Sequence, residues 1–168
     1  GRCSQCRCRV YAFGLLIMRI LLMRHAEAAP DFPDESRQLT PYGEASLRNC
    51  PEGLQPYLDE VTHIFVSPYQ RTQQTLSILL PSQKGTLLDL ITPEGDPETV
   101  LNYLQLLPDE STVLLVTHMP LVGRLYSSLV DGESRFGIGF MPAQLEVIDC
   151  DLPAAGLGRS IAQFTHQL

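Results

Sequence analysis

Tryptophan is absent from this sequence of 168 residues, lysine occurs once, at Lys84, and charged residues make up only 18% of the chain. So little charge excludes the usual composition of a disordered chain, and the apolar fraction of 44% is large enough for a packed core. No apolar run reaches the roughly 18 residues that a transmembrane helix needs. The longest candidate, Val10 to Met23, is interrupted by Arg19. We therefore expect a soluble globular protein without a membrane partner.

Positive charge is scarce beyond the first few residues. Residues 18–168 contain all 19 acidic side chains but only nine of the 12 basic ones. A body this acidic offers no surface to nucleic acid or to anionic lipid. A pocket that gathered several of the arginines would therefore be a positive site in a negative protein.

The first 17 residues differ in character from the rest. They carry three arginines, no acid and three closely spaced cysteines, Cys3, Cys6 and Cys8. A structural zinc site takes four ligands, and Cys50 and Cys150 are isolated in the sequence, so we favour a cluster that binds nothing. We expect residues 1–17 to be an extension, disordered or derived from processing, and residues 18–168 to form a single domain.

A short apolar run after these arginines also resembles a secretory signal. The nearest small-residue cleavage site, Ala26-Glu27-Ala28, lies beyond Arg24 and His25, which the chemistry below requires. Met18 is a more natural start, because a strand pattern follows it at once. With few cysteines in the body of the chain, we expect a cytoplasmic protein.

Strand-like and helix-like segments alternate along the chain. Apolar runs predict strands over 19–23, 61–66 and 112–116, a short extended piece over 87–91, and two antiparallel edge strands over 144–149 and 159–164. Helices are predicted over 40–57 with a break near Pro51, from Ser67-Pro68 to Leu80, over 96–107 and over 120–130. This alternation predicts a three-layer α/β/α sandwich around a mostly parallel sheet.

The three strong strands each end in polar side chains. Arg24 and His25 follow the first strand, a segment containing Arg71 follows the second, and His118 follows the third. Ligands of open α/β sheets bind outside the carboxyl ends of the parallel strands. Two histidines and two arginines should therefore meet at one edge of the sheet.

Such a set of side chains suits phosphoryl transfer. Two guanidinium groups can bind the oxygens of a tetrahedral phosphoryl group. One imidazole, held neutral, can attack phosphorus, while the second donates hydrogen bonds to the phosphoryl oxygens. Because the arginines and a protonated imidazole supply positive charge, we expect no metal and no other cofactor, and EDTA should leave activity unchanged.

Each of these residues also has an ordinary structural interpretation. A histidine at a strand end often bonds a backbone carbonyl, and an arginine in a first helical turn is often solvated. His63, in the middle of a strand, and His166, near the end of the chain, are expected to be structural or exposed. Only joint placement at three strand ends favours chemistry for Arg24, His25, Arg71 and His118.

Three segments resemble the motifs of the histidine phosphatase superfamily, whose fold is phosphoglycerate mutase-like. They are Leu22-Met23-Arg24-His25-Ala26-Glu27, Val66 to Thr75, and Val116 to Val122. Within that superfamily, the chain from about Met18 onward is similar to the short phosphohistidine phosphatases of the SixA type. Arg37 to Thr40 and Leu90 to Pro93 are further shared features. Ala26 departs from the pattern, since the superfamily usually has glycine there.

The resemblance implies that His25 is the nucleophile that becomes phosphorylated. The other members of the phosphate pocket would be Arg24, Arg71 and His118. Arg37 is a further candidate for contact with phosphate or substrate, or else a solvated loop arginine. Ser67 is a candidate for a phosphate contact too, although an N-cap role at the following helix already explains it.

The leaving group distinguishes the substrate classes. Expelling an alkoxide from an ester benefits from a positioned carboxylic acid, by about 10²–10⁴ in rate. Relatives that hydrolyse monoesters often have an aspartate after the second histidine, where this chain has Met119. Asp89 is the nearest match to the acid of the mutase-like branch, and its neighbours Glu94 and Asp96 suit turn and cap roles better. Expelling an imidazole, with a pKa of about 6.5, requires less help from an acid.

The motif spacing leaves little chain for a cap domain, since only 45 residues lie between His25 and Arg71. An open site suits a phosphate displayed on another protein. We therefore predict a metal-independent phosphohistidine phosphatase that acts on a phosphotransfer protein through phospho-His25 and releases inorganic phosphate. Two alternatives remain: a small-molecule phosphomonoesterase that uses Asp89 or a neighbour as acid, and a phosphate-binding module without turnover.

Overall fold

The computed structural model describes residues 17–168. Residues 1–16, with Cys3, Cys6 and Cys8, lie outside the described part, and so do nearly all of the residues predicted to form an extension. Ile17, the first described residue, is buried. Within residues 17–168, no helix combines the length and the apolarity that crossing a bilayer requires.

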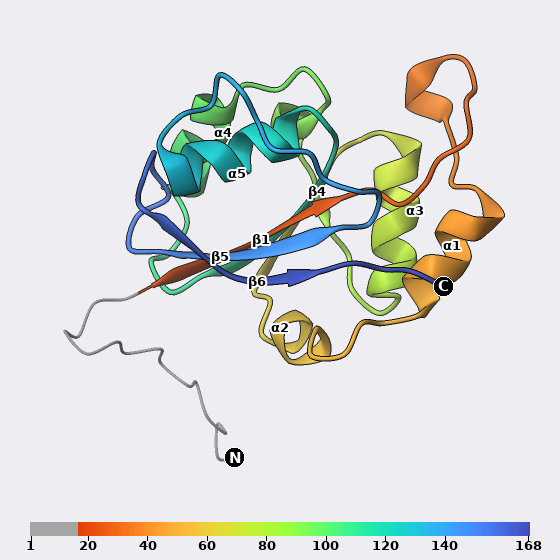
Figure 1. Ribbon diagram of the computed structural model, residues 1–168, viewed down its shortest axis with the longest axis horizontal. Coiled ribbons are helices and arrows are strands. Elements are labelled where there is room, and N and C mark those ends of the chain that lie inside the picture. The colour runs from red at the N-terminus through yellow and green to blue at the C-terminus, as the bar shows by residue number, and fades with distance from the viewer. Residues whose placement is uncertain (1–16) are drawn as a thin grey trace.

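The described residues form one six-stranded sheet in the order β3-β2-β4-β1-β5-β6 (Figure 1). The strands are β1 (Met18–Arg24), β2 (His63–Val66), β3 (Thr86–Leu87), β4 (Thr112–Thr117), β5 (Leu145–Cys150) and β6 (Gly158–Phe164). Strands β1 to β4 pair in parallel, whereas β5 runs antiparallel to both of its neighbours. The prediction of a mostly parallel sheet with an antiparallel pair at one edge is confirmed.

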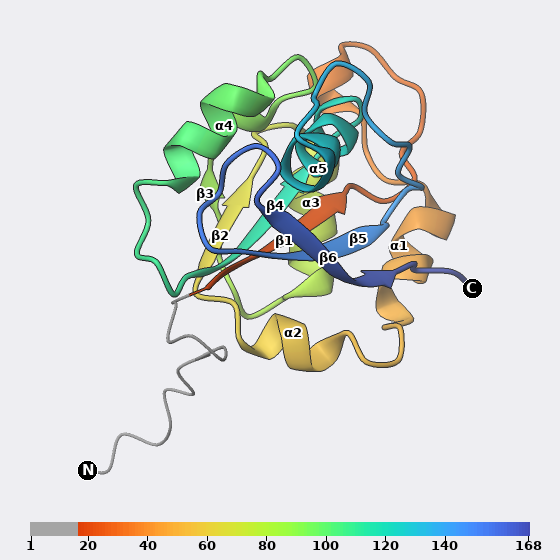
Figure 2. The same cartoon turned by 60° about the vertical axis from the view of Figure 1, so that its left-hand side comes forward.

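Helices cover both faces of the sheet (Figures 1 and 2). One face carries α1 (Pro41–Arg48), α2 (Gln55–Asp59) and α3 (Gln70–Leu79), and the other carries α4 (Pro97–Leu104) and α5 (Leu121–Asp131). Leu21 and Leu114 face the first layer, and Ile20 and Val113 face the second. Because both faces are covered, β1 and β4 are apolar at almost every position, which confirms the three-layer sandwich.

The predicted helix over 40–57 is two helices, with Pro51 between them. Thr40 caps α1 as expected, and its Oγ1 accepts a hydrogen bond from the Gly43 N–H at 3.0 Å. Ser67-Pro68 does not open α3, which begins at Gln70 with Tyr69 in the N-cap position. The N-cap prediction for Ser67 is therefore wrong, because its hydroxyl serves another partner described below.

Little chain is inserted between α3 and α4. Of the segment predicted as extended over 87–91, only Leu87 belongs to the two-residue strand β3, whereas Asp89–Ile91 form a 3₁₀ turn. A second 3₁₀ turn, Asp34–Ser36, lies in the loop after β1. The carboxyl ends of β1, β2 and β4 thus lie at one edge of the sheet, where loops border them. Among the described residues, no helical subdomain covers this edge.

Candidate active site

The two predicted histidines lie side by side at this edge. His25 directly follows β1 and His118 directly follows β4, and the two strands are paired, with Arg24 opposite Thr117. The ring centroids of His25 and His118 are 5.3 Å apart, and the rings meet edge to face at 61°. Both residues are almost fully buried, with exposed fractions of 6% and 1%. The predicted convergence is therefore observed, and we call Arg24, His25, Arg71 and His118 the cradle.

His25 presents an unprotonated nitrogen to the cradle. Its Nδ1 lies 2.7 Å from the carbonyl oxygen of Ala26. A carbonyl oxygen only accepts, so Nδ1 must carry the proton and Nε2 the free lone pair. Nε2 accepts a hydrogen bond from the Nε–H of Arg71 at 3.3 Å. The backbone therefore fixes the tautomer that nucleophilic attack through Nε2 requires.

Ala26 fits the loop after β1 without strain. Among residues 17–168, Ala143 is the only non-glycine residue with a positive φ, so Ala26 does not occupy a conformation that favours glycine. The backbone N–H of Ala26 donates to Thr75 Oγ1 at 3.1 Å, and its methyl group is buried in the core. The departure from the usual glycine leaves the loop that carries His25 intact.

His118 is oriented by Ser67. Its Nε2 lies 2.7 Å from the Oγ of Ser67, which is fully buried at the end of β2. The Nδ1 of His118 is buried and has no hydrogen-bond partner among the described residues. The serine that was considered as a helix cap or a phosphate contact thus holds the second imidazole in place.

Backbone carbonyls hold the two arginines of the cradle. Arg71 is the second residue of α3 and is only 3% exposed, and its Nη1 donates to the carbonyl oxygen of Asp34 at 2.7 Å. Arg24 donates from Nη1 to the carbonyl oxygen of Phe140, also at 2.7 Å. The Nε of Arg24 is buried without a partner in the described part of the chain. A backbone carbonyl therefore fixes one nitrogen of each guanidinium, and the guanidinium of Arg71 also donates from Nε to His25 and from Nη2 to Asp34.

Arg37 is tied to the loop after β1 and is not freely solvated. Its Nε donates to the Ala29 carbonyl oxygen at 2.9 Å and its Nη2 to that of Ala28 at 3.4 Å. Burial lowers the pKa of both Arg24 and His25, and the charge of Arg37 acts in the same direction.

Sequence reasoning missed two residues at this site. The carboxylate of Asp34 lies 3.2 Å from Nη2 of Arg71 and 3.3 Å from Nη1 of Arg37. The ring of Tyr69 packs edge to face against His118 at 5.0 Å and beneath the Arg71 guanidinium at 5.1 Å. Two features of the sequence could have identified them. Asp34 lies three residues before Arg37, and Tyr69 lies between the end of a strand and Arg71, an arginine of the cradle.

Burial and neighbouring positive charges keep both cradle histidines neutral. Burial lowers the pKa of His25 to about 4, and the charges of Arg71 and Arg24 act in the same direction. Burial lowers the pKa of His118 to about 3, helped by His25 and Arg71. A neutral His25 agrees with its expected role. The expectation of a protonated His118 is wrong for this structure, because burial outweighs every effect that favours the charged ring.

We expect the free energy of unfolding to fall as the pH drops from about 6.5 to 4. In the unfolded chain a histidine binds its proton near pH 6.5. In the folded protein His25 and His118 resist protonation until about pH 4 and about pH 3. The unfolded chain then binds more protons within this window, so acid favours unfolding.

Urea denaturation at several pH values measures this dependence. His118→Gln removes one of the two titrating groups and retains an amide that can bond Ser67. The variant should therefore lose less stability between pH 6.5 and 4 than the wild type loses. Equal losses in the two proteins would contradict the assignment.

The acids considered as proton donors do not bond to the cradle in the described structure. Asp89 is exposed at the start of its 3₁₀ turn. Asp96 caps α4, where its carboxylate accepts from the Thr99 N–H at 2.9 Å. Burial raises the pKa of Tyr69, and the charge of Glu94 adds to this effect.

The two remaining histidines lie away from the cradle, as expected. His63 bonds through Nδ1 to Thr62 Oγ1 at 2.8 Å, and His166 bonds through Nδ1 to the Ala143 carbonyl at 2.9 Å. Among the described residues, no group of three His, Cys, Asp or Glu side chains is arranged to hold a metal ion.

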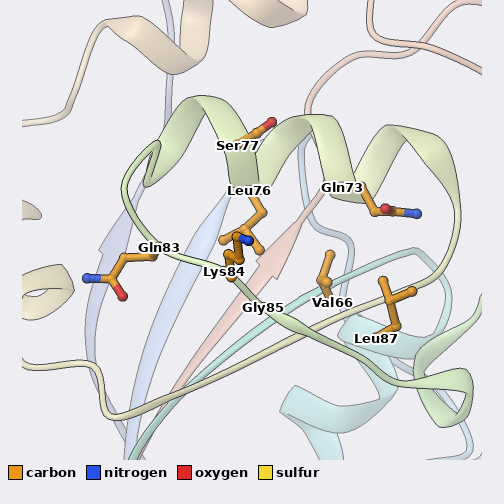
Figure 3. A pocket seen from close by; sticks show the side chains of 8 residues that line it. All are labelled: Val66, Gln73, Leu76, Ser77, Gln83, Lys84, Gly85 and Leu87. Carbon is orange, nitrogen blue, oxygen red and sulfur yellow. The ribbon is translucent and has the colours of Figure 1, made fainter.

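A separate cavity of about 250 Å³ lies between α3 and the chain that leads into β3 (Figure 3). Leu76 projects toward it from the helix, and Lys84 and Gly85 line it from the chain that leads into β3. None of the cradle residues lines this cavity. It therefore lies between α3 and the edge of the sheet at β2 and β3, and does not belong to the site.

Two phosphohistidine phosphatases are similar to this chain in sequence. No protein-family model matches the chain. The phosphohistidine phosphatase SixA of Escherichia coli is 38% identical over 125 residues, which cover 70% of this chain and 77% of the relative. A SixA homolog of Haemophilus influenzae is 34% identical over 142 residues, covering 76% of this chain and 85% of the relative.

Solved structures agree with these sequence matches. The structure of SixA complexed with tungstate superposes with a TM-score of 0.76 at 33% identity, covering 88% of this chain and 97% of the other. A phosphoserine phosphatase of Entamoeba histolytica, with a TM-score of 0.65 and 13% identity over 89% of this chain and 98% of the other, shares the fold alone. Since the sequence matches span most of both curated relatives, the chain belongs to the SixA family of phosphohistidine phosphatases, hydrolases of the histidine phosphatase superfamily.

Proposed function

We propose that this protein removes the phosphoryl group from a phosphohistidine on a partner protein, in two steps through Nε2 of His25. In the first step Nε2 attacks phosphorus, the P–N bond of the substrate breaks, and the leaving imidazole takes a proton from solvent. In the second step water attacks the phosphorus of phospho-His25, the new P–N bond breaks, and inorganic phosphate is released. The observation that carries the proposal is the unprotonated Nε2 of His25 beside the buried Arg71.

The charges of the cradle support this chemistry. Arg24 and Arg71 are fixed cations whose remaining N–H groups can bind phosphoryl oxygens, and such preorganised donors stabilise the transition state. His118 is held by Ser67 next to His25 and is suited to donate a hydrogen bond to the same oxygens. The intact cradle and the unstrained Ala26 favour turnover over a binding module.

Within residues 17–168, none of Asp89, Glu94 and Asp96 bonds to the cradle. The carboxylate of Asp34 does, but it is an anion paired with Arg71 and Arg37 and has no proton to donate, so the site favours phosphohistidine over an ester as substrate. An alkoxide needs a proton donor to leave, whereas imidazole is a far better leaving group. The names of the relatives from Escherichia coli and Haemophilus influenzae, both phosphohistidine phosphatases, support the same substrate class. The partner would be a phosphotransfer or phosphocarrier protein.

A comparison of substrates tests the proposal. We expect kcat/KM on a phosphorylated histidine-carrier protein to exceed that on p-nitrophenyl phosphate and on glucose 6-phosphate by at least about 100-fold, the scale of a missing general acid. A preference for the sugar ester that disappears in Asp89→Asn would instead favour the phosphomonoesterase alternative.

Removal of divalent metal is expected to leave turnover unchanged. In the proposed reaction Arg24 and Arg71 provide the positive charge that stabilises the phosphoryl oxygens. Dialysis against EDTA, followed by assay on the phosphorylated carrier protein, measures this. Activity that falls on chelation and returns with Mg²⁺ or Zn²⁺ would contradict it.

We further propose that residues 18–168 act as a single domain in the cytoplasm. The described cysteines, Cys50 and Cys150, are both free, as a reducing compartment would keep them. Activity of a chain that starts at Met18, and its presence in the cytosolic fraction of cells, test the two statements.

A further inference from the structure

We infer that the carboxylate of Asp34 competes with phosphate for the guanidinium of Arg71, and so weakens the binding of inorganic phosphate, the product of the proposed reaction, at the cradle. The inference rests on the proposed function, because it takes the cradle as the site that binds the phosphoryl group.

Asp34 lies on the outward side of a buried cation. The side chain of Arg71 is only 4% exposed, whereas that of Asp34 is 50% exposed. The Asp34 Oδ2 lies 3.2 Å from Nη2 of Arg71, and its Oδ1 lies 3.3 Å from Nη1 of Arg37. An anion that reaches Arg71 from solvent therefore meets a carboxylate already bonded to the same nitrogen.

The carboxylate is not needed to hold Arg71 in place. Nη1 of Arg71 donates to the backbone carbonyl of Asp34 at 2.7 Å, and Nε donates to His25 at 3.3 Å. Both contacts remain when the side chain at position 34 is changed. The side chain of Asp34 occupies only Nη2, so its removal frees one donor without releasing the guanidinium.

Asp34 is an anion at neutral pH. Partial burial acts to raise the pKa of its carboxyl, but hydrogen bonds from Arg37 and Arg71 outweigh burial and lower it. Its negative charge therefore opposes the entry of a phosphate dianion and offsets part of the attraction of Arg71. A phosphoryl group on a partner protein gains further contacts from that protein's surface, whereas free phosphate gains none. The repulsion from the carboxylate acts on both phosphoryl groups, but only the substrate has further contacts that offset it, so the carboxylate favours release of the product.

Two neutral substitutions separate this role from a general effect of charge. Asp34→Asn keeps the size of the side chain and removes the charge. Glu35→Gln is the control: it removes the charge of the neighbouring residue, whose side chain has no hydrogen bond to Arg71 in the described structure. The dissociation constant of inorganic phosphate is measured by calorimetry, and its inhibition constant by assay with p-nitrophenyl phosphate.

We expect Asp34→Asn to bind phosphate about fivefold more tightly, the upper range for a partly exposed ion pair. Glu35→Gln should stay within about twofold of the wild type, and Asp34→Ala should shift in the same direction as Asp34→Asn. Unchanged or weaker phosphate binding in both Asp34 variants, with a wild type that binds phosphate, would overturn the inference. Failure of the wild type to bind phosphate or tungstate would instead count against the proposed function.

Discussion

Replacement of His25 by alanine is expected to abolish the phosphoenzyme and to lower kcat on phosphohistidine by at least about 10³-fold. The reason is that both steps of the proposed reaction require the bond between phosphorus and Nε2 of His25, which alanine cannot form. The cradle supplies charge and orientation, but His118 cannot replace His25. Its Nε2 is engaged with Ser67, and in the proposed reaction its otherwise unpartnered Nδ1 carries the proton that is donated to the phosphoryl oxygens.

The phosphoenzyme is measured directly. Wild-type protein is mixed with a radiolabelled phosphodonor and quenched in denaturant, and the label on the protein should survive alkali and be lost in acid. His63→Ala, at a histidine outside the cradle, is the matched control and should retain the label. Equal labelling of the wild type and His25→Ala would contradict the assignment of the nucleophile.

Gly123→Ala is expected to destabilise the protein by about 2 kcal/mol and to lower its activity as well. Alanine is the better helix former by about 1 kcal/mol, so this substitution within α5 would normally stabilise. At this position, however, a Cβ atom would clash with the backbone carbonyl oxygen of Ile138. A backbone atom cannot yield as a flexible side chain can, so the loop after α5 has to move.

That movement reaches the cradle. The same loop provides the carbonyl of Phe140 that accepts from Arg24 at 2.7 Å, and the N–H of Ala143 that donates to the His25 carbonyl at 3.0 Å. Gly139→Ala, one residue from Ile138, is the control, because a Cβ there would meet nothing within 4 Å. Urea unfolding and kcat are measured for both variants. A Gly123→Ala protein as stable and as active as Gly139→Ala would show that the loop has room to adapt.

The strands and their shared edge could be predicted because they depend on local pattern and one topological rule. Continuous apolar runs at 19–23 and 112–116 indicate strands covered on both faces, and right-handed βαβ connections then place their carboxyl ends together. Arg24, His25, Arg71 and His118 follow from their positions just after those runs. Their placement could be predicted without knowledge of any contact between side chains.

The partners of these residues could not be predicted, because each is distant in the sequence. Ser67 and His118 are 51 positions apart, and Asp34 and Arg71 are 37 apart. A serine before a proline fits an N-cap as well as it fits a bond to an imidazole. The charge state of His118 depends on burial by several elements at once, which a local pattern does not contain.

The hydrogen bond between His25 and the carbonyl of Ala26 determines more than a tautomer. Under the proposed reaction, Nδ1 is blocked and only Nε2 can be modified, so the phosphorylated enzyme carries the τ isomer of phosphohistidine and never the π isomer. Antibodies that distinguish the two isomers would therefore detect the resting intermediate in cell extracts with the τ reagent alone, even where the partner protein carries the other form.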